Sequence, residues 1–303
     1  MGRISEWIAG RTARNRPIFT GVRRHLTSME VRGVQIAREL DGICTRCRYL
    51  TEATVASAPA LIWVIEPELD LVKKFDPLTV QFFDPINPRV DPSGEFSGMN
   101  QSFRYLLLNT ESSINWLGPE PETGWMSFVI PHHHCNKTGY RLPESRLEKP
   151  KVVGYLGQPE HLHDGDEIKA AVEKMGLEFR SFDTWDLDAY QNIDIGIAWT
   201  RRDELRDQTR SNIKLANFAA HGIPSVVCDY ESYRAVDKEL GGAALVRADL
   251  TDFIQGIHEL ATSPEKRRAI HAKADQADQT YSLTAIAQQY QSAIARAKED
   301  AQR

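Results

Sequence analysis

The sequence is poor in cysteine and has no long uninterrupted run of apolar residues. Four cysteines occur in 303 residues, and only Cys44 and Cys47 have the C-x-x-C spacing. A zinc site built on this motif needs a second pair of ligands, so the spacing predicts ordinary reduced thiols, with thiol–disulfide chemistry as the alternative. No stretch reaches the about 18 apolar residues of a membrane-spanning helix, and the start of the chain lacks the apolar core of a signal peptide. We therefore expect a cytoplasmic protein.

The chain also lacks a strong excess of either charge. It has 37 basic and 42 acidic residues, a net charge of −5, which argues against a protein that binds polyanions over its whole surface. The arginines are unevenly placed, because residues 1–50 contain ten arginines and only four acidic residues. Such a basic segment suits peripheral contact with the anionic inner face of a membrane or with a polyanion, and it equally suits a solvated surface.

Apolar segments alternate with amphipathic ones in two halves of the chain. Residues 60–65 are continuously apolar and β-branched, as in strands buried on both faces of a parallel sheet. The pattern begins again at residue 151, where a predicted strand runs into Gly157. Parallel strands need crossover connections, so the alternation predicts an α/β protein with two Rossmann-like, doubly wound domains facing a cleft. In such sheets ligands bind at the carboxyl ends of the strands.

We expect a first domain over residues 1–135, a linker over 136–150, a second domain over 151–280, and a C-terminal helix over 281–303 that packs back on the first domain. The predicted strands are 17–22, 60–65, 79–83, 125–130, 151–157, 177–182, 193–198, 225–228 and 243–246. The predicted helices are 28–40, 164–175, 212–221 and one opened by Ser263-Pro264, and residues 85–100 are expected to form a loop.

Residues 211–227, Ser-Asn-Ile-Lys-Leu-Ala-Asn-Phe-Ala-Ala-His-Gly-Ile-Pro-Ser-Val-Val, predict a helix followed by a buried strand. The amino end of a helix offers N–H groups and a partial positive charge, which suit a phosphate. Lys214 adds a full charge on the first turn. Gly222 permits a left-handed helix end, and Pro224 begins the strand. The segment therefore predicts a diphosphate site at the amino end of the helix.

This segment resembles the donor-site motif of GT-B glycosyltransferases, in particular the group 1, family 4-like donor domain. In that family a lysine stands near the helix start and the helix ends in Ala-x-Gly-x-Pro, matched here by Lys214, Ala220, Gly222 and Pro224. One position departs from the motif, because Asn217 stands where the family has a ribose-binding glutamate. An asparagine can still bond a hydroxyl, but without the strength that a carboxylate gives such a bond.

The resemblance extends from about residue 151 to 298, since residues 152–157 and 190–197 are similar to the strands that flank the donor helix in the family. It implies that the second domain binds a nucleotide sugar, a UDP- or GDP-sugar used as co-substrate, with no cofactor and no metal ion. The first domain would then bind the acceptor, a glycan, a lipid-linked glycan or another hydroxyl compound. A role in polysaccharide biosynthesis is consistent with this activity.

Candidate site residues follow from their places at strand ends and helix starts and, for Asn217, from the resemblance to the motif. We expect catalytic roles for Lys214, His25 and Arg210, the histidine because an imidazole titrates near neutral pH. The expected donor-binding residues are Gly157, Thr200, Ser211, Asn212, Asn217, Glu231 and Ser232, and the last two can instead cap a helix. The expected acceptor-side residues are Arg23, Arg24, Glu66 and Asp84.

Three consecutive histidines, His132 to His134, invite a metal-site hypothesis that the local geometry does not favour. Adjacent side chains of an extended segment point to alternate faces, so the three imidazoles do not converge on one ion. We therefore expect no metal site at this segment.

Three other functions remain open at this point. An epimerase on the same architecture would need acid and base carboxylates around the donor sugar, and the sequence offers no convincing set. A non-catalytic GT-B-like binding or partner protein would be consistent with Asn217 and with a short first domain. A glycosyltransferase that modifies nucleic acid would use the arginines of residues 1–50, but few aromatic residues for base stacking lie among them.

Overall fold

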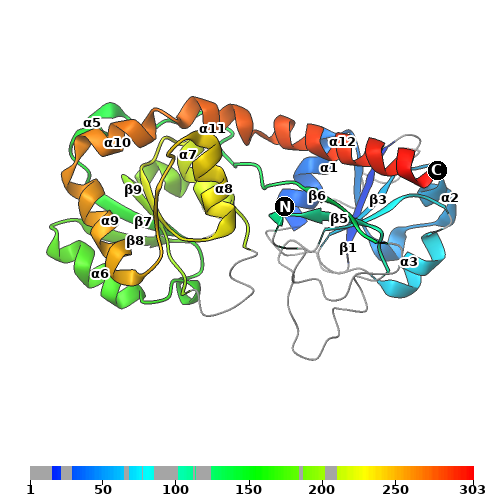
Figure 1. The fold of residues 1–303 in the computed structure, drawn as a ribbon, viewed down its shortest axis with the longest axis horizontal. Coiled ribbons are helices and arrows are strands. Elements are labelled where there is room, and N and C mark those ends of the chain that lie inside the picture. The colour runs from blue at the N-terminus through cyan, green and yellow to red at the C-terminus, as the bar shows by residue number, and fades with distance from the viewer. Residues whose placement is uncertain are drawn as a thin grey trace. The chain divides into compact units, whose positions relative to one another are not determined.

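The computed structural model describes residues 16–21, 29–64, 68–76, 78–84, 102–111, 113, 124–183, 187–201 and 210–303. The chain divides into two compact units, each built on one sheet (Figure 1). The first unit consists of Met1–Ile130 with Leu283–Arg303, and the second of Pro131–Ser282. All strand pairs in both sheets are parallel, which confirms the predicted α/β class with two doubly wound sheets.

The sheet of the first unit has the strand order β2-β1-β3-β4-β5-β6. Its strands are β1 (Ile18–Gly21), β2 (Ile43–Arg46), β3 (Leu61–Val64), β4 (Gln81–Asp84), β5 (Tyr105–Leu108) and β6 (Met126–Val129). The helical segments are the π-helix η2 (Met29–Gln35), α1 (Ile36–Glu39), the 3₁₀ turn η3 (Cys47–Tyr49), α2 (Glu52–Ala56), α3 (Leu69–Phe75) and α12 (Leu283–Ala301). Trp63, Phe83 and Leu106 belong to the buried core of this sheet.

The first unit differs from the sequence prediction in two ways. Residues 28–40 were expected to form one helix, but the described part is a π-helix over Met29–Gln35 that continues as a short α-helix. Strands β2 and β5 were not predicted. Strand β2 is only four residues long and contains Thr45 and Arg46, so its apolar pattern is too short to separate it from a loop.

The C-terminal helix α12 belongs to the first unit (Figure 1, red). It packs beside α1, and the ring of Tyr290 lies 5.8 Å from the ring of Phe19 on β1. Ile286, Ala287, Ala293 and Ala297 are buried on the same helix. The apolar stripe of α12 therefore covers one face of the first sheet, although the two segments are far apart in the sequence.

The sheet of the second unit has the strand order β11-β10-β9-β7-β8. Its strands are β7 (Val152–Leu156), β8 (Glu178–Phe182), β9 (Ile195–Ala198), β10 (Ser225–Cys228) and β11 (Leu245–Arg247). The helices are α5 (Glu144–Glu148), α6 (Gly165–Lys174), α7 (Ile213–Ala220), α8 (Glu231–Leu240), α9 (Leu250–Thr262), α10 (Pro264–His271) and α11 (Ala274–Thr280), with 3₁₀ turns η5 (Pro159–His161) and η6 (Leu187–Asn192).

Residues 136–150, expected to be a linker, are part of the second unit in the structure. Leu142 and Leu147 are buried against Phe218 of α7, and Leu147 lies on the short helix α5. These two leucines give the segment an apolar contact that its polar composition and two prolines obscure.

Among the described residues, no helix combines the length and the apolarity that crossing a membrane requires.

Candidate functional site

The carboxyl ends of β7 and β9 define the first part of the candidate site. Strand β7 pairs with β8 on one side and with β9 on the other, so the chain changes direction across the sheet between β7 and β9. Connections that leave such neighbouring strands diverge to opposite faces, and the space between them is the usual ligand site of an open α/β sheet. Gly157 directly follows β7, and Thr200 lies two residues beyond β9.

Lys214 lies on the first turn of α7 and is held over an aromatic ring of β7. Its Nζ is 3.8 Å from the centre of the Tyr155 ring, a cation–π contact. Gly157 leaves the room for this arrangement, because a Cβ at that position would lie 2.7 Å from the Tyr155 Oη and 3.0 Å from the Lys214 Nζ. The contact with Tyr155 fixes an amine at the carboxyl end of β7.

The amine of Lys214 is electrostatically unusual. Burial, and secondly the nearby positive charge of Arg210, lower the pKa of Lys214 to about 7. No carboxylate among the described residues contributes to the pKa of this amine. An anion bound beside this amine favours its protonated form and so raises its pKa, because the negative charge opposes both causes of the lowered pKa.

Arg210 lies near Lys214 and contacts Thr200. An Nη1 of Arg210 donates a long hydrogen bond of 3.5 Å to the Thr200 Oγ1, and that hydroxyl donates to the carbonyl of Trp199 at 2.9 Å. The Tyr230 Oη, after β10, donates to the Thr200 carbonyl at 3.5 Å. The structure thus brings Lys214, Arg210, Gly157 and Thr200 together at the carboxyl ends of β7 and β9.

Helix α7 starts without a side-chain cap. Asn212 occupies the N-cap position, but its side chain makes no capping hydrogen bond, and its main chain has helical dihedral angles. The first N–H groups of α7 are therefore not satisfied by a capping side chain, as an anion site requires. Ser211, half-buried, directly precedes this helix start.

The two asparagines of α7 have a different role from the donor contacts expected of them. Asn212 is buried, and its amide bonds the main chain of His132 twice, accepting from the N–H at 2.8 Å and donating to the carbonyl at 3.1 Å. Asn217 accepts from the N–H of Cys135 at 2.7 Å and donates to the Ile213 carbonyl at 2.8 Å. Both amides hold residues 132–135 against α7. The side chain of Asn217 both donates and accepts a hydrogen bond, which an ionised glutamate at this position could not do.

Glu231 and Ser232 lie on the first turn of α8, directly after the loop that follows β10. The N-cap position is held by Tyr230, whose side chain makes no capping hydrogen bond. Ser232 is buried, and its hydroxyl has no hydrogen-bond partner within the described part of the chain. A buried hydroxyl without a partner costs free energy, so Ser232 stays a candidate for a ligand contact.

The three histidines have separate surroundings. All three are buried; the Nδ1 of His133 contacts the His134 carbonyl at 2.7 Å, and the Nε2 of His134 lies 3.1 Å from an Asp278 carboxylate oxygen. Burial is the main cause that lowers the pKa of His134. No group of three potential metal ligands occurs among the described residues.

In the first unit, Asp84 is a buried structural ion-pair partner. Its Oδ2 accepts from the Arg32 Nε at 2.7 Å and from the Tyr290 Oη at 2.9 Å, and its side chain is fully buried. The guanidinium of Arg32 also donates to the Asn109 Oδ1 at 3.1 Å and to the Ile130 carbonyl at 2.8 Å. Asp84 was expected to act toward an acceptor, but its charge is neutralised by Arg32.

The other expected acceptor-side groups, Arg23, Arg24, His25 and Glu66, lie outside the described residues. In sequence they follow β1 and β3, which are neighbours in the sheet at the point where its strand order reverses. Their assignment stays a prediction.

Sequence reasoning missed Tyr155, the ring beneath Lys214. Its signal was present in Val-Val-Gly-Tyr-Leu-Gly157, because an aromatic residue near the end of a buried strand is placed to face the glycine turn. The C-x-x-C cysteines, by contrast, are free, and burial raises the pKa of Cys44 to about 12 and of Cys47 to about 11. Few thiolates form under these conditions, which makes both thiols poor nucleophiles.

No protein-family model matches the sequence, and no curated protein matches it. Its structure is similar to those of many solved proteins. A glycosyltransferase from Rickettsia africae aligns with a TM-score of 0.61 at 10% identity, over 93% of this chain and 98% of that chain. The lipopolysaccharide outer core galactosyltransferase WaaB aligns with a TM-score of 0.59 at 12% identity, over 93% of this chain and 99% of that chain. HepE from Anabaena, solved with UDP-glucose, aligns with a TM-score of 0.55 at 10% identity, over 94% of this chain and 99% of that chain. The chain therefore has a GT-B glycosyltransferase-like fold.

Proposed function

We propose that this chain transfers a sugar from a UDP- or GDP-sugar to a hydroxyl of a glycan or a similar acceptor. The observation that carries the proposal is the position of Lys214 at the start of α7 and at the strand-order reversal between β7 and β9. Its amine lies beside Arg210, and no carboxylate in the described part of the chain contributes to its pKa. Such a site attracts the diphosphate of a nucleotide sugar.

In the transfer, the bond between the sugar's anomeric carbon and the donor's phosphate oxygen breaks, and a bond from that carbon to the acceptor oxygen forms. The acceptor hydroxyl loses its proton, and the nucleoside diphosphate leaves with one more negative charge. Lys214, Arg210 and the N–H groups of α7 would stabilise this charge as it develops, which is the way fixed positive groups accelerate a reaction. The resemblance implies that no metal ion is needed for this step.

Ribose recognition must differ from that of the resembled family. Asn217 stands at the position of the ribose-binding glutamate, but Cys135 and Ile213 already occupy its amide. We expect donor binding to rest on the diphosphate, with Ser232 as a further candidate contact.

A non-catalytic GT-B-like binding protein is the second candidate, and the occupied amide of Asn217 is the observation that favours it. A protein of this kind would bind nucleoside diphosphate through Lys214 without turning over a nucleotide sugar. Peripheral contact with an anionic membrane or with nucleic acid through the arginines of residues 1–50 stays a separate proposal.

Thermal denaturation with UDP or GDP tests the binding step. We expect at least one of them to raise the melting temperature of the wild type, and Lys214→Ala to lose this stabilisation. Lys169→Ala is the matched control, because Lys169 lies on the exposed side of α6 and pairs only weakly with Glu173 at 3.9 Å. Stabilisation that survives Lys214→Ala would contradict the proposed site.

A panel of nucleotide sugars then separates the two candidate functions. Slow release of free UDP or GDP from one donor, without an acceptor and dependent on Lys214, would favour transfer. Binding without release from any donor would favour the non-catalytic protein.

A further inference from the structure

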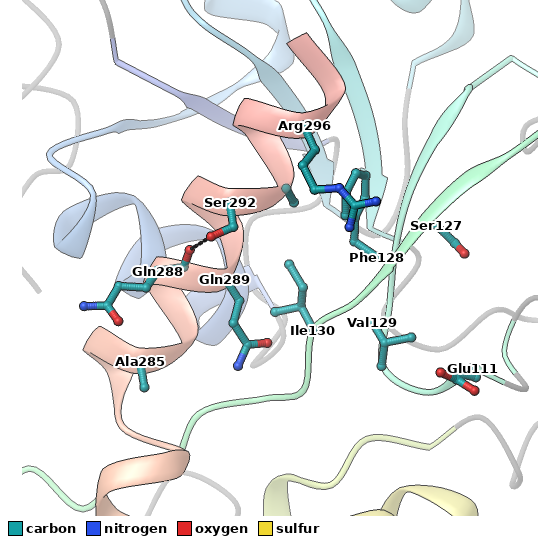
Figure 2. A pocket seen from close by; sticks show the side chains of 11 residues that line it. Glu111, Ser127, Phe128, Val129, Ile130, Ala285, Gln288, Gln289, Ser292 and Arg296 are labelled. Carbon is teal, nitrogen blue, oxygen red and sulfur yellow. Dashed lines mark hydrogen bonds between the residues drawn. The ribbon is translucent and has the colours of Figure 1, made fainter. Parts of the chain in front are cut away.

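A groove of about 640 Å³ lies in the first unit between the edge strand β6 and helix α12 (Figure 2). Residues 127–129 of β6 and Ile130, which follows the strand, line one side of it, and α12 contributes Gln289, Ala293 and Arg296 among others. Figure 2 shows Gln289 and Arg296 extending from α12 toward the strand. All of these residues belong to the first unit, so the groove shares no residue with the site around Lys214.

Strand β6 presents main-chain hydrogen-bond groups to this groove. It pairs with β5 and ends the strand order, so no described strand pairs with its other edge. The N–H groups of Met126 and Ile130 donate to Arg104 and Leu108 on the β5 side. Successive residues of a strand direct their N–H and C=O groups to opposite sides, so those of Ser127 and Val129 point to the open edge.

Two features that often protect edge strands, charged side chains and proline, are missing from β6. Its sequence, Met-Ser-Phe-Val, has no charge and no proline, and Val129 is 40% exposed. Exposed apolar edges of this kind readily pair with another extended chain. The helix beside the edge supplies a second wall, which is the arrangement in which an added strand finds both main-chain partners and side-chain contacts.

Two opposite charges line the groove without ion-pair partners among the described residues. The Arg296 guanidinium lies 5.6 Å from the centre of the Phe128 ring, and the exposed carboxylate of Glu111 lines the same groove. An extended peptide with one acidic and one basic side chain would match both charges. A sugar ring would need an exposed aromatic face, whereas Phe128 is 9% exposed and carries Arg296 over its ring.

We infer that the β6–α12 groove binds an extended segment of a partner protein, which adds to the sheet as a strand next to β6 and pairs an acidic side chain with Arg296. The inference is independent of the proposed transfer reaction. It requires main-chain hydrogen bonds from Ser127 and Val129 and a charge contact at Arg296.

The test uses a phage-displayed library of random nonapeptides against the full-length protein, with bound phage counter-selected on Val129→Pro. Proline at position 129 removes the outward N–H and leaves the bonds to β5 intact, because a proline is tolerated where the N–H faces away from the sheet. Val129→Ala is the matched control, since it shortens the side chain and keeps the N–H.

We expect an enriched peptide with at least one acidic residue. Val129→Pro should weaken its binding about tenfold and Val129→Ala by about threefold at most. A second measurement uses the wild-type protein and therefore needs no variant that folds. It compares two N-methylated forms of the peptide, one methylated at the odd positions and one at the even positions. One form should lose binding, because its methyl groups face β6, and the other should bind as before. Far-UV circular dichroism and the melting temperature without ligand check that each variant folds.

Failure to enrich any peptide would overturn the inference. So would equal binding to the wild type and to Val129→Pro, or equal binding of the two N-methylated peptides. Binding of maltotriose or triacetylchitotriose in the groove, detected by chemical-shift changes at Gln289 and Val129, would also overturn it and would assign the groove to carbohydrate. Loss of the UDP response through Lys214 would leave the peptide result unaffected, so the two proposals fail separately.

Discussion

The two sheets place basic side chains near their carboxyl ends with opposite outcomes. In the first unit, Arg32 is buried against Asp84, and Asn109, Ile130 and Tyr290 complete the network. In the second unit, no carboxylate among the described residues contributes to the pKa of Lys214, and its neighbouring charge is another cation, Arg210. The difference is the counter-ion: a paired charge holds a fold together, whereas a charge without a partner is prepared for an anionic ligand.

The largest effect is expected when Asp84, the counter-ion of Arg32 in the first unit, is replaced. Asp84→Ala leaves the guanidinium of Arg32 buried without its charge partner, which should lower the free energy of unfolding by about 3–5 kcal/mol. Urea denaturation followed by circular dichroism measures this loss. The double variant Arg32→Met, Asp84→Leu should recover much of it, and a loss below about 1 kcal/mol in Asp84→Ala would refute a structural role for the pair.

The corresponding change in the second unit should have the opposite profile. Lys214→Ala should weaken UDP or GDP binding by about 1.5–3 kcal/mol, because a charge-assisted contact to the diphosphate is lost. It should not destabilise the fold, since it also removes repulsion from Arg210. Isothermal titration calorimetry and urea denaturation measure the two quantities. A variant that loses stability and retains affinity would reverse the comparison between the units.

The pH dependence of binding sharpens the same contrast. In the free protein the pKa of Lys214 is about 7, and a bound diphosphate should raise it. Only the charged amine favours the anion, so affinity should be full below pH 7 and fall as the pH rises above 7. Titration at pH 8 in buffers of different ionisation enthalpy should show proton uptake on binding. Proton release, or an affinity that rises with pH, would contradict this assignment.

The smallest expected effect concerns the asparagines of α7. Asn217→Ala removes hydrogen bonds to Cys135 and Ile213, which should lower the free energy of unfolding by about 1 kcal/mol. Because the amide is directed at the main chain, the affinity for UDP or GDP should change by less than about threefold. A large loss of affinity with unchanged stability would show that Asn217 binds the donor after all.

The sequence sufficed for the parts of this fold that depend on continuous apolar runs and helix ends. Strands β3, β7 and β10, and the helix that carries Lys214, lie where the pattern predicts them, since each is a buried segment bounded by glycine, proline or polar residues. Strand β5, Tyr-Leu-Leu-Leu, is equally apolar but was missed, because four residues do not distinguish a strand from one turn of a buried helix.

The site was predictable only where a local signal exists. Lys214, Gly157 and Arg210 could be selected because a helix start and a strand end mark ligand positions in any parallel sheet. The pairing of Arg32 with Asp84, 52 positions away, has no local signal, and neither has the contact of Asn217 with Cys135. Both depend on which strands become neighbours, and that is decided by packing across the whole unit.

A crystal structure of the protein with UDP or GDP is the most direct measurement of the central proposal. We predict diphosphate oxygens within hydrogen-bond distance of the Lys214 Nζ and of the first N–H groups of α7, with Tyr155 still beneath the amine. A nucleotide bound away from α7, or a start of α7 covered by residues of the same chain when the nucleotide is present, would contradict it.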